Sequence, residues 1–207
     1  MKKFIVTFAL IHLCTFTLFA DDDCLIYKIS PKVAVSVPEW KKEVVQPLRP
    51  MDLLHGNVIA TLVENYSLGA ESEAIEDGYC IILRDVSAAV GYSDFLVQVD
   101  SRHAPNSCAY NITVEHEDRH IAAHLSVIDD MSGEIKRAIL DASNSIMPVF
   151  VRTAADADAA FDKMNTEIQN NPAIILMKQK IQAEQEIRNK KVDQTSDSRQ
   201  IEECGVY

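Results

Sequence analysis

The chain has 207 residues, a length that suits one domain with a hydrophobic core and a further helical segment. Its 31 acidic residues outnumber its 20 basic residues, and the formal charge is −11. This excess of negative charge disfavours nucleic acid and anionic membrane surfaces as partners. The sequence shows no internal repeat, so repeat architectures are excluded as well.

Residues 1–20 have the composition of a secretory signal peptide. Lys2 and Lys3 precede an apolar stretch, and Ala20 precedes three aspartates, which predicts cleavage after Ala20. The apolar stretch is short for a membrane span, and an uncleaved membrane anchor is the alternative interpretation. We expect no stable membrane span after signal removal and a periplasmic or secreted location. Loss of the two lysines with the leader lowers the formal charge from −11 to −13.

Four cysteines follow the expected leader: Cys24, Cys80, Cys108 and Cys204. An even number of cysteines in an exported protein predicts two disulfide bonds. Three pairings are possible, and the spacing does not decide among them. We prefer Cys80–Cys108 within the folded body and Cys24–Cys204 between the chain ends. Zinc coordination by these cysteines is disfavoured because no CxxC spacing occurs.

Runs of apolar and β-branched residues in the first half predict strands over residues 32–37, 57–66, 78–83 and 94–99. Gly91 and Ser93 predict a turn between the last two of these strands, which would then pair as neighbours. The acidic segment 71–78 predicts a surface loop.

The second half predicts helices. The first is expected to run from a cap at Asn106 or Ser107 to about Met131, because this segment lacks glycine and proline. A second helix is expected over residues 134–147, and its short connection predicts that it folds back beside the first. Residues 153–192 predict a helical extension.

These elements together predict an α+β fold, with a β-rich N-terminal half, two helices and a C-terminal helical extension. The expected organisation is a signal peptide (1–20), a zincin-like α+β domain (21–152), the helical extension (153–192) and a polar tail (193–207). The tail is expected to be mobile unless Cys204 is bonded.

The segment His116-Glu117-Asp118-Arg119-His120 is an HExxH sequence. On a helix the two histidines lie one turn apart on one face, so both imidazoles can reach one metal ion. Zinc is the expected cofactor, with His116 and His120 as ligands at about 2.0–2.1 Å. Glu117 would be the general base on a zinc-activated water, and the reaction would be hydrolysis of a peptide bond.

The local spacing does not specify the third metal ligand. Ala123 and Ser126 occupy the positions at which the metzincin pattern requires glycine and histidine, so that pattern is excluded. On the expected returning helix, Asp141 is the first candidate and Glu134 the second. His124 lies a further turn along the first helix, where a role beside the ligands or in solvent is expected.

Two further expectations concern the substrate, which would be a peptide or a protein. The strand 94–99 is expected to bind an extended peptide through its edge. His103, Tyr110 or Arg119 could stabilise negative charge on the carbonyl oxygen, and the sequence singles out none of them.

The leader, the β-rich first half and Cys108 at the start of an HExxH helix resemble a bacterial secreted family of predicted zinc-dependent proteases of the zincin type. The resemblance covers roughly residues 25–150, and only His116, Glu117 and His120 carry over residue by residue. It implies an exported zinc metallopeptidase. The alternative is a non-catalytic periplasmic or envelope protein, for binding or assembly, whose HExxH helix is structural or a relic.

Overall fold

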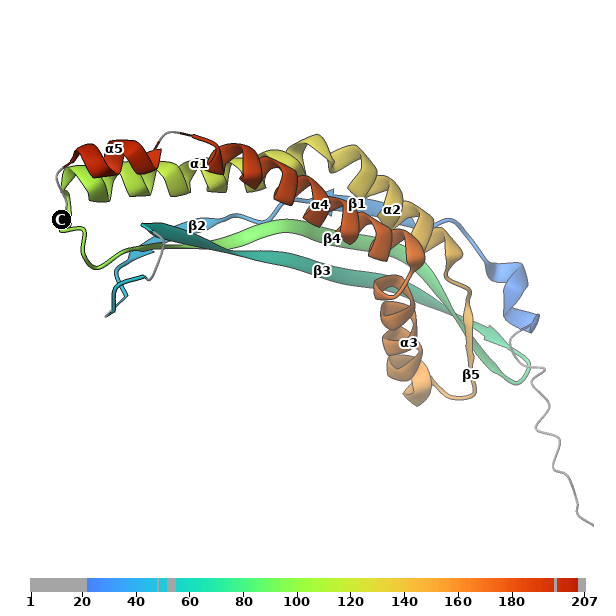
Figure 1. Ribbon diagram of the computed structural model, residues 1–207. Helices are drawn as coiled ribbons and strands as arrows, with labels where there is room; N and C mark the ends of the chain where they lie inside the picture. Colours follow the sequence, from blue (N-terminus) through green and yellow to red (C-terminus); the bar gives the residue numbers. More distant parts are fainter. Residues whose placement is uncertain (1–21, 48, 52–54, 196, 205–207) are drawn as a thin grey trace, which may run out of the picture.

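The computed structural model describes residues 22–47, 49–51, 55–195 and 197–204 (Figure 1). The predicted signal peptide lies outside these residues. The sheet is built mainly from the first half of the chain and the helices from the second, which confirms the predicted α+β class. Within the described ranges, no helix is long and apolar enough to cross a bilayer.

A long antiparallel hairpin is the central feature of the sheet (Figure 1). Its strands are β3 (Gly56–Ile75) and β4 (Gly78–Val99). At about 3.3 Å per residue, β4 is roughly 70 Å long. Three short strands pair with the other edge of β4: β5 (Val149–Val151) antiparallel, and β1 (Lys32–Ser36) and β2 (Lys41–Val45) parallel.

The strand β4 runs straight through the predicted turn at Gly91 and Ser93, so that prediction was wrong. The register shifts where Leu62 pairs with Tyr92, which leaves Ser93 as the extra residue of a β-bulge. Gly91 has a φ of 156°, and a Cβ there would lie 2.9 Å from Cδ of Pro38. The glycine therefore permits an unusual backbone conformation and a close approach within one continuous strand.

The acidic segment 71–78 is mostly strand and not the predicted loop. β3 continues to Ile75, and only Glu76 and Asp77 form the turn of the hairpin. Glu71 and Glu73 are exposed on this part of β3, so the acidic composition marks a solvated strand rather than a break in it.

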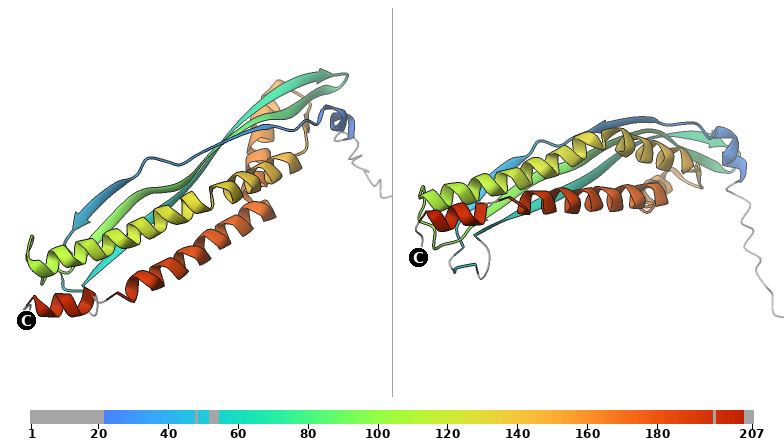
Figure 2. Two further views of the ribbon diagram at one scale, coloured as in Figure 1. Left: turned by 90° about the horizontal axis from the view of Figure 1, so that it is seen from above. Right: turned by 45° about the horizontal axis from the view of Figure 1, so that its top comes forward.

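Helices α1 (Cys108–Asp130) and α2 (Ser132–Ser145) lie along one face of the sheet, as Figures 1 and 2 show. Helix α4 (Pro172–Asp193) packs beside both, and α3 (Ala157–Gln169) precedes it. The short α5 (Asp197–Glu203) lies beside the beginning of α1. Two 3₁₀ segments, η1 (Asp22–Tyr27) and η2 (Ala154–Asp156), complete the described elements.

Local signals explain where the main helices begin. Ser107 caps α1, because its hydroxyl accepts a hydrogen bond from the Tyr110 N–H at 3.2 Å. Asn171 caps α4 by accepting from the Ala173 N–H at 2.9 Å, and Pro172 occupies the first turn, where its missing N–H is not needed.

The returning helix is α4, not the segment 134–147. Met131 is both the last cap of α1 and the first cap of α2, so no loop exists that could reverse the chain. Helix α2 therefore continues away from α1, and α4 runs back beside both helices (Figure 2). This reversal places the end of α4 next to the HExxH segment of α1.

One hydrophobic core lies between the helices and the sheet. Alternate residues of β4, such as Val86 and Val97, are fully buried in it. Ile174 and Ile181 of α4 are fully buried in the same core, so the C-terminal helices belong to the body of the fold.

Two disulfide bonds are present, as predicted, but their pairing differs from the preferred one. Cys24 is bonded to Cys80 and Cys108 to Cys204. Cys80 lies near the beginning of β4, and Cys108 follows its end. The preferred Cys80–Cys108 pairing was wrong because the length of β4 separates these two residues.

Candidate metal site

Side chains from α1 and α4, two helices far apart in the sequence, converge beside the start of β3. The Nε2 atoms of His116 and His120 are 3.1 Å apart. Oδ1 of Asp193 lies 3.1 Å from Nε2 of His120 and 3.7 Å from Nε2 of His116. Ligand atoms around a tetrahedral zinc, with bonds of about 2.0–2.1 Å, lie about 3.3 Å apart. The three atoms have this spacing, and the group could hold a metal ion.

The other ring nitrogen of each histidine faces an oxygen. Nδ1 of His116 is 2.9 Å from Oδ2 of Asp197, and Nδ1 of His120 is 3.0 Å from Oδ1 of Asn189. Both oxygens accept, so each Nδ1–H donates and each neutral imidazole keeps its lone pair on Nε2. Two lone pairs and the Asp193 carboxylate therefore face one another, an arrangement that a cation stabilises.

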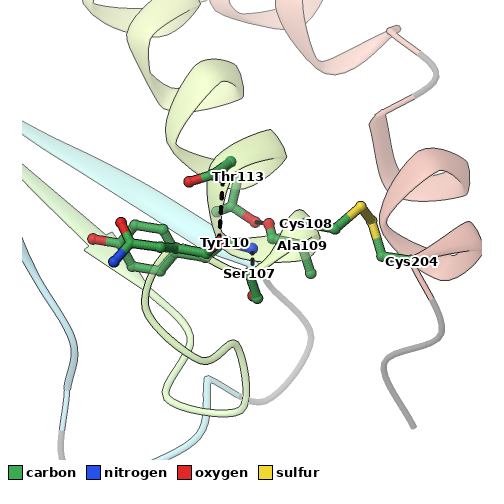
Figure 3. Close-up of a disulfide and its surroundings, with 8 residues drawn as sticks. Ser107, Cys108, Ala109, Tyr110, Thr113 and Cys204 are labelled. Carbon is green, nitrogen blue, oxygen red and sulfur yellow. Dashed lines mark hydrogen bonds between the residues drawn. A yellow bond between two sulfur atoms is a disulfide. The ribbon is translucent and has the colours of Figure 1, made fainter.

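Asp197 is held as a carboxylate at the beginning of α5. Burial alone would raise its pKa, but hydrogen bonds from Thr195, His116 and Arg119 outweigh burial and lower the pKa of Asp197 to about 2. The Cys108–Cys204 disulfide joins the far end of α5 to the start of α1 (Figure 3). The segment that orients His116 is thus fixed at both ends.

Glu117 points from α1 toward the beginning of β3. Its side chain is 4% exposed, and burial raises the pKa of its carboxyl, although the two histidines act in the opposite direction. A Cβ on Gly56 would lie 2.7 Å from Oε1 of Glu117 and 2.5 Å from Cγ2 of Thr113. Only glycine therefore leaves room for the carboxylate at this place in β3. No hydrogen bond joins the Glu117 carboxylate to another described residue.

The metal group and Glu117 line a single pocket of about 460 Å³. The pocket lies between β3, α1, the end of α4 and α5, and its other lining side chains include His55, Asn57, His124, Thr195 and Ile201. The arrangement combines two imidazoles, two carboxylates and a concave space large enough for part of a small ligand.

Neither predicted third ligand belongs to this group. Glu134 forms a surface ion pair with Lys180 at 2.7 Å, and Asp141 is exposed on α2. Both lie on a helix that leads away from the HExxH segment. Asp193 takes the place expected of them.

His124 lies beside the metal group in the same pocket. Its Nε2 is 3.5 Å from Nδ2 of Asn189, the residue that also binds His120. Its ring contacts the rings of Tyr92 and Phe95. Burial lowers the pKa of His124, which favours the neutral imidazole.

The substrate expectations do not fit the structure. Within residues 94–99, β2 and β3 occupy the two edges of the strand, so no free edge remains there for a peptide. Of the described residues that line the pocket, none is His103, Tyr110 or Arg119. His103 is buried beside His55, and Arg119 is paired with Asp197.

Sequence reasoning missed Asp193 and Asp197, because the polar segment that contains them was expected to be a mobile tail. The preferred Cys24–Cys204 pairing would have tied this segment to the other end of the chain, whereas Cys204 is bonded to Cys108. The correct Cys108–Cys204 pairing was one of the three possible arrangements. It would have brought this segment to the start of the HExxH helix.

The chain matches no known protein family, and no curated protein or solved structure matches it either.

Proposed function

We propose that the protein is an exported, zinc-dependent metallopeptidase. The observation that supports this most is the sharing of one pocket by the His116–His120–Asp193 group and the buried Glu117. Two imidazoles and one carboxylate form a ligand set typical of catalytic zinc, which leaves a coordination position open. The hydrogen bonds that the two Nδ1–H groups donate to Asp197 and Asn189 fix both imidazoles in the orientation that zinc requires.

Zinc, when bound, supplies a Lewis acid that polarises a carbonyl group and makes water a stronger nucleophile. Glu117 accepts a proton from the water as its oxygen adds to the peptide carbonyl carbon. Glu117 then returns the proton to the amide nitrogen as the C–N bond breaks, which leaves an amine and a carboxylic acid that loses its remaining proton to solvent. The pKa of Glu117 is raised by burial, which makes its carboxylate a stronger base toward the water.

The proposed location is the periplasm or the cell exterior. The two disulfides are in keeping with an oxidising compartment. The leader-like residues 1–20 supply the proposed export signal.

The test uses the chain without residues 1–20, loaded with zinc and assayed on a mixture of unrelated peptides. We expect about one zinc per chain, hydrolysis that a chelator stops, and recovery when zinc is restored. Glu117→Gln should keep the zinc and lower kcat by about 10²–10⁴. The matched control is Glu115→Gln, an exposed neighbour on α1, which should keep full activity.

One outcome would support the non-catalytic alternative instead. The metal group joins α1 to the end of α4, so zinc could serve only to hold these helices together. Tight zinc binding without any peptide cleavage, and with a lower melting temperature for His116→Ala, would favour that structural role.

A further inference from the structure

His55 lies in the metal pocket and is hydrogen-bonded to a second, buried histidine. Its Nδ1 is 3.1 Å from Nε2 of His103. The two ring planes differ by only 26° and the ring centroids are 5.2 Å apart. The rings therefore meet edge to edge through these nitrogens rather than face to face. Because the two nitrogens of an imidazole point in different directions, Nε2 of His55 points away from His103.

The surroundings of His103 decide which nitrogen of His55 carries the proton. His103 is 2% exposed, and its buried Nδ1 has no hydrogen-bond partner among the residues that the structure describes. A buried N–H without an acceptor costs more than a buried acceptor without a donor, so the proton of His103 is on Nε2. Burial, and then the neighbouring His55, lower the pKa of His103, which keeps it neutral. His103 therefore donates to Nδ1 of His55, and His55 carries its own proton on Nε2.

The segment around this pair is fixed by a buried carboxylate. Asp100 accepts hydrogen bonds from the Arg102 side chain at 2.8 and 2.9 Å and from the Met51 N–H at 2.8 Å. The Asp100 N–H donates to the carbonyl oxygen of His55 at 2.8 Å, and the His103 N–H donates to that of Asp100 at 3.0 Å. Both histidines are thus tied to the end of β4, which is why the orientation of His55 is set before any ligand binds.

We propose that His55 is a fixed hydrogen-bond donor of the metal pocket, whose Nε2–H binds a carbonyl or anionic oxygen of the ligand. The ligand class rests on the proposed function: in peptide hydrolysis this oxygen is the carbonyl oxygen, which becomes negative when water adds to the carbonyl carbon. A preorganised donor stabilises that charge without further rearrangement. His103 is the positioning residue, because it acts only by fixing the tautomer of His55.

The first test determines the tautomer of His55 directly, by ¹⁵N NMR of the zinc-loaded protein with labelled histidines. We expect His55 with a protonated Nε2 and an accepting Nδ1. His103→Leu should remove this preference while the zinc content stays the same. A wild-type His55 that is protonated on Nδ1, or on both nitrogens at pH 8, would overturn the proposal, whether or not the protein cleaves peptides.

The second test measures binding of a phosphonamidate peptide, whose tetrahedral anionic group resembles a peptide carbonyl after water has added. His55→Leu should weaken binding by roughly tenfold or more, since a hydrogen bond to a charged group is lost. His55→Gln, which keeps an N–H donor, should recover part of the affinity. In a double-mutant cycle, adding His103→Leu to His55→Leu should cause no further loss of affinity for the peptide.

The outcomes separate this proposal from the proposed function. Equal affinity of the wild type and His55→Leu, including no binding by either, would overturn the role of His55 even if the wild type cleaves peptides. A wild type that binds the probe through His55 but cleaves no peptide would support the donor and contradict the peptidase. Melting temperatures of all variants confirm that each is folded.

Discussion

Asp193 supplies the carboxylate oxygen that the HExxH helix by itself lacks. It does so from the last residue of α4, at 3.1 Å from Nε2 of His120. Asp193→Ala removes one of the three proposed ligands and should lower zinc affinity by about 100-fold or more. Loss of a residue that only hydrogen-bonds to a ligand already lowers metal affinity by about 10–100-fold. Competition with a chromophoric chelator measures this affinity.

The controls for this prediction are the two acids that the sequence favoured. Glu134→Gln breaks only an exposed ion pair with Lys180, and Asp141→Asn changes an exposed side chain of α2. Both variants should bind zinc as the wild type does. If either variant lowers zinc affinity more than Asp193→Ala does, the assignment of Asp193 as the third ligand is wrong.

Asp100 links the stability of the protein to pH. Burial alone would raise its pKa, but hydrogen bonds from Arg102 and the Met51 N–H lower the pKa to about 2 in the folded protein. A carboxyl with a lowered folded pKa stabilises the protein above its ordinary pKa, and this contribution is lost as the pH falls through about 4 to about 2. Asp100→Asn should therefore lower the free energy of unfolding at pH 7 by roughly 1–2 kcal/mol.

Urea denaturation between pH 7 and pH 3 measures this effect. The difference between the wild type and Asp100→Asn should be largest at pH 7 and should shrink below pH 4. Asp85→Asn is the control, since Asp85 is an exposed aspartate of β4. A difference that grows as the pH falls would contradict the assigned role of Asp100.

At the scale of elements, α5 holds His116 of the candidate metal site in its orientation. One end contributes Asp197, which binds His116, and the other end is bonded to the start of α1 through Cys108–Cys204. Replacing both of these cysteines by serine should release α5 and lower zinc affinity by roughly 10–100-fold, because His116 then loses its orienting carboxylate.

The second disulfide provides the control. Cys24–Cys80 joins η1 to the beginning of β4, at the opposite end of the molecule from α5 (Figure 1). Replacing this pair by serine should lower the free energy of unfolding by about 2–5 kcal/mol, as expected for a native disulfide. Zinc affinity, measured at a temperature where circular dichroism shows both variants folded, should stay unchanged. Equal loss of affinity in the two variants would show a general loss of structure instead.

The sequence predicts what local geometry determines and misses what packing determines. The helical period places His116 and His120 one turn apart, and Ser107, one of the two caps expected there, determines where α1 starts. The approach of Asp193 depends on the direction of α2 and α4, which no local pattern encodes. The bulge at Ser93 was misinterpreted for a related reason, because glycine and serine mark a bulge and a turn alike.

At the scale of the whole molecule, the long hairpin of β3 and β4 carries α1, α2 and α4 along one face (Figures 1 and 2). The HExxH segment meets residues far along the chain, such as Asp197, which is 81 residues from His116. A metal ion at this group would join α1 to the end of α4 only in the folded state. Zinc binding should therefore stabilise the entire fold and not the pocket alone.

Thermal unfolding with and without zinc tests this coupling. At a zinc concentration about 1,000-fold above Kd, binding to the folded state contributes about 4 kcal/mol. For a protein of this size that corresponds to a rise in Tm of roughly 10 °C. With affinity reduced about 100-fold, Asp193→Ala should show about one third of this rise at the same zinc concentration. Magnesium should have no comparable effect, because it prefers oxygen ligands to imidazole. If Asp193→Ala shows the full zinc-induced rise in Tm, the stabilising zinc binds elsewhere, and the link between α1 and α4 does not depend on this group.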